Sequence, residues 1–386
     1  MKTKHVIAIG FTVDKESNNV SGLSMMFELF CTIAKDAGYV VHIISLNSSK
    51  TNSKVGIVGY KRLFEYFKII FLAIGFFFRF KGAILYFNPS TAKTGGYKDI
   101  FLINISRLFG CRILMQQFGA LFDSYFSSLS KTMQTILGYS YNKAEIIIVE
   151  GDYAKQQYGF INKKDRIIVI NNGLPEKNNI KQTNGKFFDS NDQFELFYMN
   201  NMIESKGYID VLKAIDILRN EYKLNVYCTF AGRFMSVIDD ELFASPDEAQ
   251  NWFVQFISEK KLSDSISYYN CVFDKNKAKC FIRSNAFLLP SYYIFEGQPT
   301  AILEALSYGS VPIVTNYRLI PDMVTDSCGL FVNAKFPYEI ADAVRFLMNN
   351  PDTYHKMSQQ CIDVFNEKFT QKRYTEKIVK LLNEYF

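Results

Sequence analysis

Short apolar runs alternate with longer amphipathic stretches along the first half of the chain. Runs of strand length cover residues 6–11, 40–45, 84–88, 112–116, 146–149 and 167–170. Helical patterns over residues 22–37, 63–80, 99–109, 129–142 and 153–158 separate these runs. Such alternation predicts βαβ units and a parallel sheet, in which ligands bind at the carboxyl ends of the strands.

The alternation resumes after a polar interval, residues 176–192, which has the composition of a linker. Strands are predicted at 194–199, 226–231, 266–269, 286–289, 311–315 and 330–332. Helices are predicted at 208–221, 248–260, 275–283, 299–308, 337–349, 353–365 and 371–386. The pattern therefore predicts an α/β protein with one Rossmann-like domain over residues 1–175 and a second over 193–368.

Residues 290–315 hold two glutamates, Glu296 and Glu304, on either side of a turn. This turn is rich in helix-start signals: Gly297, Gln298, Pro299 and Thr300. Because proline is favoured at the first helical position, we expect the helix to start at Pro299. The free N–H groups and the dipole at a helix start favour a phosphate.

The two carboxylates would flank this anion site. Glu304 lies about one turn into the helix, and Glu296 lies in the loop before it. A nucleotide-sugar has a matching shape, because its diphosphate lies between two hydroxyl-bearing ends, the ribose and the sugar. The alternative is a pair of solvated glutamates, which the apolar surroundings make a poor fit.

The segment FEGQPTAILEALSYGSVPIV resembles the signature of the retaining glycosyltransferases of family 4. The shared features are the paired glutamates, the Gly-x-Pro turn and the Glu-Ala helix. This resemblance implies the GT-B fold, in which two Rossmann-like domains face each other across a cleft. It also implies that the last helix, residues 369–386, packs back on the first domain.

Lys206 lies at a predicted helix start with Ser205 as its cap. The helix dipole disfavours a cation there, so a lysine at this point fits a bound anion; a solvated lysine is the alternative. In the family, a lysine followed by glycine binds the donor diphosphate. The family's arginine five residues earlier is Asn201 here, and Arg233 is a candidate to replace it.

Two loops of the first half carry further candidates. Ser21 and Gly22 start a predicted helix where the family often has a glycine pair near the donor diphosphate. An ordinary capped loop is the alternative. Many relatives carry a histidine before the glycine that follows the fourth strand, and this chain has Phe118 there. Gln117 and Asp123 are therefore candidates, with Phe118, for shaping the acceptor side.

Composition narrows the class of protein. The net charge is +6, which suits anionic ligands or an anionic membrane surface and does not suggest a nucleic-acid binder. Seven scattered cysteines without a CxxC motif indicate a reduced, cytoplasmic protein without a zinc site. With three histidines, all in regular elements, a Ser-His-Asp arrangement is not expected.

The resemblance implies a retaining glycosyltransferase of the hexosyltransferase type that uses a nucleotide-diphosphate sugar, with Glu296 and Lys206 as catalytic residues. Relatives often build bacterial O-antigen, capsule or lipopolysaccharide, so we expect a glycan acceptor that is lipid-linked. The sequence lacks an Asp-x-Asp motif, so we expect no metal and no cofactor besides the donor. The alternatives are a nucleotide-sugar epimerase or hydrolase on the same fold, and a non-catalytic nucleotide-sugar-binding scaffold.

Residues 60–82 contain an apolar core over 69–78, which is shorter than the roughly twenty residues that cross a bilayer. The βαβ pattern favours a buried crossover helix, and a helix lying in the membrane interface is the alternative. The phenylalanines of this segment are flanked by five cations and a single acid, Glu65. The cations are Lys61, Arg62, Lys68, Arg79 and Lys81. Such cations suit anionic lipid, so we also expect peripheral contact with the inner face of the cytoplasmic membrane.

Overall fold

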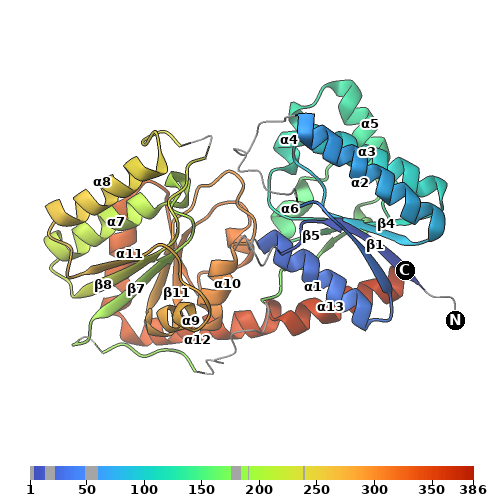
Figure 1. The fold of residues 1–386 in the computed structure, drawn as a ribbon. Coiled ribbons are helices and arrows are strands. Elements are labelled where there is room, and N and C mark those ends of the chain that lie inside the picture. The colour runs from blue at the N-terminus through green and yellow to red at the C-terminus, as the bar shows by residue number, and fades with distance from the viewer. Residues whose placement is uncertain (1–3, 14–21, 48–59, 175–183, 190, 238–239) are drawn as a thin grey trace. The chain divides into compact units, whose positions relative to one another are not determined.

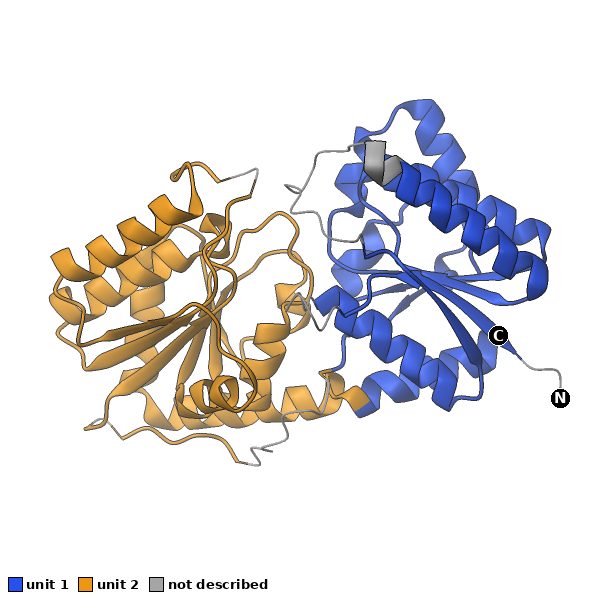
Figure 2. Cartoon of the chain, viewed as in Figure 1, with its two compact units in different colours: residues 1–173, 372–386 blue, residues 174–371 orange. Residues whose placement is uncertain are grey.

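The structure, a computed structural model, describes residues 4–13, 22–47, 60–174, 184–189, 191–237 and 240–386, with backbone alone at 60–63 and 93. The chain forms two compact units (Figures 1 and 2). Unit 1 comprises residues 1–173 and 372–386, and unit 2 comprises residues 174–371. Ser21, and residues 176–183 and 190 of the predicted linker, lie outside the described residues.

Unit 1 is built on a parallel sheet with six strands in its described part, in the order β2-β1-β3-β4-β5-β6. The strands are β1 (His5–Gly10), β2 (Val40–Ser45), β3 (Ile84–Phe87), β4 (Arg112–Gln117), β5 (Ile146–Val149) and β6 (Ile167–Val169). All residues of β3 and β5 are buried, which is expected of central strands that helices cover on both faces.

The helices of unit 1 include one from the far end of the chain. They are α1 (Gly22–Asp36), α2 (Tyr60–Arg79), α3 (Lys93–Leu108), α4 (Phe122–Ser128), α5 (Lys131–Tyr141), α6 (Asp152–Gln156) and α13 (Gln371–Tyr385). Ile378 and Leu382 of α13 share a buried cluster with Phe27 and Phe30 of α1. The expected return of the last helix to the first unit is therefore seen in the packing of α13.

Unit 2 contains a second parallel sheet, in the order β12-β11-β10-β7-β8-β9 within the described residues. Its strands are β7 (Phe194–Met199), β8 (Val226–Ala231), β9 (Ile266–Tyr269), β10 (Ala286–Leu289), β11 (Val311–Thr315) and β12 (Leu330–Val332). Its helices are α7 (Tyr208–Asp216), α8 (Pro246–Glu259), α9 (Asp274–Arg283), α10 (Thr300–Ser307), α11 (Pro337–Asn349) and α12 (Pro351–Lys368).

The α/β prediction is confirmed, and the described strands begin and end within one residue of their predicted bounds. Helices differ more. The predicted helix 208–221 is α7 followed by a π-helical turn, Ile217–Glu221. The helix α4 was not predicted, because its sequence FDSYFSS is short and poor in strong helix formers.

Part of the predicted linker packs on unit 2. Lys186 donates hydrogen bonds to the carbonyl oxygens of Phe281 and Ser284, at 2.6 and 2.5 Å, and to Ser310 Oγ at 2.9 Å. Burial lowers the pKa of its ammonium to about 7. Residues 184–189 therefore extend unit 2 toward the N-terminus. No helix in the described part of the chain is long and apolar enough to cross a membrane.

Candidate functional site

The candidate site lies where the strand order of the unit 2 sheet reverses. From β7 the chain runs outward to β8 and β9, whereas β10 lies on the other side of β7 and leads to β11 and β12. The loops that follow β7 and β10 therefore start side by side at the carboxyl edge of the sheet. In open α/β sheets, this reversal point is where ligands bind.

The loop after β7 carries Lys206 in a tight turn. A 3-10 turn, Glu204–Lys206, is followed by Gly207 at φ 82, and α7 begins at Tyr208. A Cβ atom at Gly207 would lie 2.6 Å from the carbonyl oxygen of Pro290, so both the left-handed backbone and the close approach require glycine. The prediction that Ser205 caps the helix is wrong, because Gly207 occupies the N-cap.

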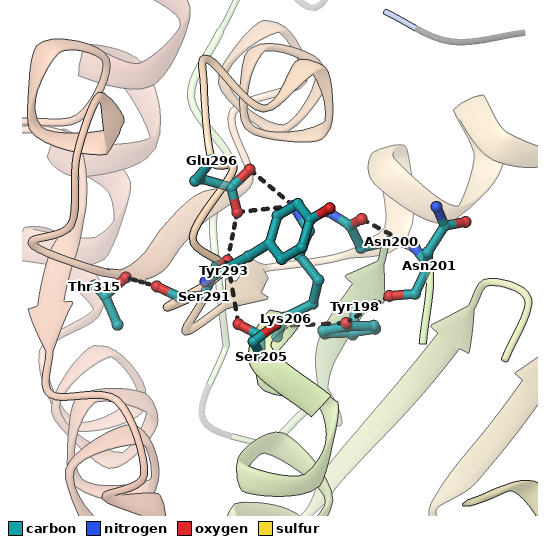
Figure 3. Close-up of polar contacts among 9 residues, drawn as sticks. All are labelled: Tyr198, Asn200, Asn201, Ser205, Lys206, Ser291, Tyr293, Glu296 and Thr315. Carbon is teal, nitrogen blue, oxygen red and sulfur yellow. Dashed lines mark hydrogen bonds and ion pairs between the residues drawn. The ribbon is translucent and has the colours of Figure 1, made fainter. Parts of the chain in front are cut away.

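Lys206 forms a buried ion pair with Glu296 from the loop after β10 (Figure 3). Its Nζ atom lies 2.8 Å from each carboxylate oxygen of Glu296. The two side chains are 9% and 4% exposed. Ser291 Oγ donates a further hydrogen bond to the Glu296 carboxylate, and the ring of Tyr293 lies 4.4 Å from the Lys206 ammonium.

Backbone contacts hold these two loops together. The Tyr292 N–H donates to the carbonyl oxygen of Ser205 at 2.8 Å. Thr315, at the end of β11, donates to the carbonyl oxygen of Ser291 (Figure 3). Tyr198 on β7 donates to the Lys206 carbonyl oxygen at 3.5 Å. The ends of β7, β10 and β11 thus fix the position of the ion pair.

Glu204 anchors a third loop at the same edge. Its buried carboxylate accepts hydrogen bonds of 2.9–3.0 Å from the backbone N–H groups of Glu241, Leu242 and Phe243, which follow β8. A carboxylate that accepts several backbone N–H bonds holds a loop firmly. The loop after β8 is therefore tied to the turn that carries Lys206.

The helix α10 starts one residue later than predicted. Pro299 is its N-cap, with φ −61 and ψ 116, and Thr300 is its first residue. This extended ψ angle takes Pro299 out of the helix, although the residue still precedes it directly. Gln298 and Pro299 are buried and Gly297 is half-buried.

Glu304 is placed one turn into α10, as predicted, and it is 8% exposed. Its carboxylate pairs with Lys277 of α9 at 2.5 Å. Burial raises the pKa of the Glu304 carboxyl above its ordinary value, and the Lys277 ammonium opposes this rise. Glu304 and Glu296 therefore have different cationic partners, on different elements.

Asn201 and Arg233 are exposed and adjacent. The Met202 N–H donates to the Arg233 carbonyl oxygen at 2.9 Å, and Met202 and Phe234 form a parallel bridge. The loops after β7 and β8 thus bring the backbones of Asn201 and Arg233 together. Arg233 therefore stays a candidate to replace the arginine that the resemblance implies at the position of Asn201.

The remaining candidates belong to unit 1. Gly22 is the half-buried first residue of α1. Gln117 is 2% exposed; its Oε1 accepts from the Tyr158 hydroxyl at 3.0 Å, and its Nε2 donates to the Phe118 carbonyl oxygen. Phe118 is half-buried, and Asp123 is exposed at the start of α4. Of these side chains, Asp123 is the most accessible to an acceptor, whereas Gln117 faces the core.

Sequence reasoning missed four residues that build the site: Glu204, Lys277, Ser291 and Tyr293. Ser291 and Tyr293 directly follow the predicted strand 286–289, which is a signal that could have identified them. Lys277 and Glu204 gave no such signal, because their partners lie 27 and 37 or more positions away in the chain. The described residues contain no group of three or more His, Cys, Asp or Glu side chains that could hold a metal ion.

Residues 179–363 match the model of the family described as Glycosyl transferases group 1. This stretch is a little under half of the chain. It lies within unit 2 and contains Lys206, Glu296 and Glu304. The match supports a glycosyltransferase. No curated protein matches the sequence.

Solved structures of similar fold cover both units. Sucrose-phosphate synthase from Thermosynechococcus elongatus has a TM-score of 0.71 and 13% identity, over 99% of each chain. Anabaena Alr3699/HepE in complex with UDP has a TM-score of 0.70 and 10% identity, over 98% of this chain and 100% of that one. A glycosyltransferase from Rickettsia africae has a TM-score of 0.68 and 14% identity, over 100% and 99%. The fold is thus that of GT-B glycosyltransferases.

Proposed function

We propose that the protein is a retaining glycosyltransferase that moves a sugar from a nucleotide-diphosphate donor to a glycan acceptor. The observation that carries this proposal is the buried Lys206–Glu296 ion pair. The pair lies at the strand reversal of unit 2 and inside the stretch that matches the group 1 glycosyl transferases. Anabaena Alr3699/HepE has been solved with UDP and with UDP-glucose, which supports a nucleotide-sugar as the donor.

Lys206 is proposed to stabilise the charge on the departing diphosphate. Its ammonium is held in place by Glu296 and by the Tyr293 ring, so it is preorganised for a second anion. Preorganised positive groups in a dry site stabilise a developing charge without reorganisation. The free N–H groups at the start of α10, directly after Pro299, would donate hydrogen bonds to the same phosphates.

Glu296 is proposed to change partners when the donor binds. In the free protein its carboxylate neutralises the Lys206 ammonium, which offsets the cost of burying either charge. The donor diphosphate would take over part of this neutralisation. The Glu296 carboxylate would then accept hydrogen bonds from hydroxyl groups of the sugar that is transferred.

Glu304 and Arg233 would hold the nucleotide end. Glu304, one turn into α10, would accept hydrogen bonds from ribose hydroxyls. Arg233, whose backbone adjoins that of Asn201, would supply the second cation for the diphosphate. Gln298 and Thr300 beside the helix start would complete the donor contacts.

Retention of configuration is proposed with the departing phosphate as the base. The bond between the anomeric carbon and the diphosphate oxygen breaks, and the acceptor oxygen bonds to the same face of that carbon. The acceptor proton passes to the departing phosphate oxygen. Lys206 and the α10 start supply the positive charge that this step needs, so we propose that the reaction is metal-independent.

The acceptor is proposed to be a lipid-linked glycan in bacterial surface-polysaccharide synthesis, such as O-antigen or capsule. The enzyme would then act in the cytoplasm at the inner face of the cytoplasmic membrane. This part of the proposal rests on the resemblance to polysaccharide-building relatives and on the basic, phenylalanine-rich helix over residues 60–79.

A donor screen tests the proposed function. The purified protein is mixed with a panel of nucleotide-sugars, with and without extracted lipid-linked glycans, and released nucleoside diphosphate is measured. We expect release that depends on the acceptor and continues when a chelator is present.

A product sugar of altered stereochemistry without acceptor would indicate an epimerase, and release of the free donor sugar without acceptor would indicate a hydrolase. Donor binding without turnover would indicate a scaffold. Loss of activity in chelator with rescue by magnesium would contradict metal independence.

A further inference from the structure

The helix α2 presents apolar side chains on two opposite sides. On its inner side, Ala73 and Phe77 are fully buried within unit 1. On its outer side, four phenylalanines are largely exposed: Phe64 (71%), Phe67 (63%), Phe71 (80%) and Phe78 (68%). The expectation of a buried crossover helix therefore accounts for one side of α2 and leaves the other unexplained.

The outer phenylalanines form one continuous row. Their spacing of three, four and seven residues brings all four to the same side of a helix with 3.6 residues per turn. The row continues onto the end of α3. There, Phe78 meets the ring of Phe109 edge-on at 6.4 Å, and the neighbouring Leu108 is 81% exposed. Apolar surface of this extent on a protein generally marks an interaction site.

A row of cations runs beside the phenylalanines. Lys68 and Arg79 are exposed and lie three turns apart along α2, at the edge of the phenylalanine row. The Lys81 ammonium lies 5.6 Å from the centre of the Phe78 ring. Glu65, the acidic residue of α2, is half-buried and lies one helical turn before Lys68. The outer face thus combines bulky apolar rings with positive charge.

We propose that this outer face of α2 docks on the surface of an anionic lipid bilayer. The phenyl rings would enter the boundary between headgroups and acyl chains, while Lys68, Arg79 and Lys81 would contact lipid phosphates. At twenty residues with a charged edge, α2 suits an orientation along the surface and not across the bilayer. Because this surface lies in unit 1, its binding to lipid can be tested separately from the chemistry proposed for unit 2.

A second copy of the chain fits this face less well. A symmetric dimer places the same patch on both subunits, so each basic row would face its own copy. Like charges in such a contact repel each other. An anionic bilayer supplies the opposite charge along the whole row, and it also buries the rings.

Vesicle binding tests the proposal. The full chain is sedimented with vesicles of phosphatidylcholine mixed with phosphatidylglycerol, and with vesicles of phosphatidylcholine alone. We expect binding to the anionic vesicles that weakens as salt is raised, since screening acts on the cations. Lys68→Glu/Arg79→Glu should reduce the binding constant by about thirtyfold or more, because each cation near an anionic surface contributes roughly a factor of five. Phe64→Ser/Phe71→Ser should also reduce it, at all salt concentrations.

Matched controls come from unit 2. Lys275→Glu/Lys279→Glu makes the same change in net charge at exposed positions, and Phe273→Ser removes an exposed ring. These variants should bind vesicles as the wild type does. Equal loss in the control variants, or unchanged binding in the α2 variants, would overturn the proposal. A thermal melt of each variant shows that the fold is kept.

A fluorescent reporter gives an independent readout. The sequence contains a single tryptophan, Trp252, in α8 of unit 2. In a Trp252→Phe background, Phe71→Trp places the one indole in the outer row of α2. Vesicles with brominated acyl chains should quench its fluorescence if the row enters the bilayer. Absence of quenching on bound vesicles would overturn the proposal, as would lipid-free dimerisation that Phe71→Ser abolishes.

Discussion

Lys206 and Glu296 form a buried ion pair that their positions in the sequence do not reveal. Both residues were predicted to act at the donor site, but as separate groups at a helix start and in a loop. They are 90 positions apart, and their pairing depends on the order of strands in the sheet. The residue types could thus be predicted from the sequence, whereas the ion pair required the fold.

Glu304 allows a test by pH. Because burial raises the pKa of its carboxyl above the ordinary value of 4.5, the folded chain favours the neutral form more than the unfolded chain does. Its contribution to the free energy of unfolding is therefore greatest below about pH 4.5 and declines as the pH rises through the raised pKa. We expect the difference in unfolding free energy between wild type and Glu304→Gln to decline over this range, by up to ~1.4 kcal/mol per pH unit.

Urea unfolding at a series of pH values checks this expectation. The fluorescence of Trp252, which packs between Phe243 and Phe256, reports on unit 2. Lys277→Met serves as a companion variant, because it removes the cation that opposes the rise in pKa. In this variant the decline should extend to higher pH. A difference between wild type and Glu304→Gln that stays constant with pH would contradict the burial effect.

At the scale of elements, strands were predicted more closely than helices. Apolar runs bounded by polar residues mark a buried strand directly, as at β10 and β11. The start of α3 was missed by six residues because Gly95 and Gly96 suggest a loop. In the structure these glycines admit Ser90 and Tyr125, whose oxygens would lie 1.9 Å from an added Cβ atom. Tertiary contacts of this kind have no local signal.

The last helix, α13, provides a test at the same scale. Ile378 and Leu382 are fully buried in unit 1, although they lie next to unit 2 in the sequence. Ile378→Ala or Leu382→Ala should destabilise unit 1 by ~2–5 kcal/mol, the range for such buried truncations. Hydrogen exchange should rise in peptides of β1 and β3 and stay unchanged in those of β7 and β10. Lys380→Ala, on the exposed side of α13, should leave both units unchanged.

At the scale of the whole molecule, the alternating pattern predicted two sheets but not their strand orders. Strand order depends on pairing between distant segments, such as β7 with β10, which no local pattern encodes. The order nonetheless decides where the site lies, since it brings the loops after β7 and β10 together. The family match covers residues 179–363, and the reversal point of the unit 2 sheet falls within it.

The central claim is that the Lys206–Glu296 pair drives sugar transfer from a nucleotide-diphosphate donor. Lys206→Ala and Glu296→Gln test it, with Arg283→Ala as a control that removes an exposed cation paired with Glu195. Each site variant removes one charge of the buried ion pair and leaves the other charge without its partner. A thermal melt followed by Trp252 fluorescence therefore first shows that unit 2 is folded.

The most direct measurement is the rate of acceptor-dependent nucleoside diphosphate release by these variants. We predict that Lys206→Ala loses on the order of a hundredfold or more, the range for removing a well-placed group that stabilises a leaving charge. Glu296→Gln should lose turnover severely while its nucleotide affinity stays close to that of the wild type, and Arg283→Ala should behave as the wild type. Wild-type rates in folded Lys206→Ala or Glu296→Gln would contradict the account.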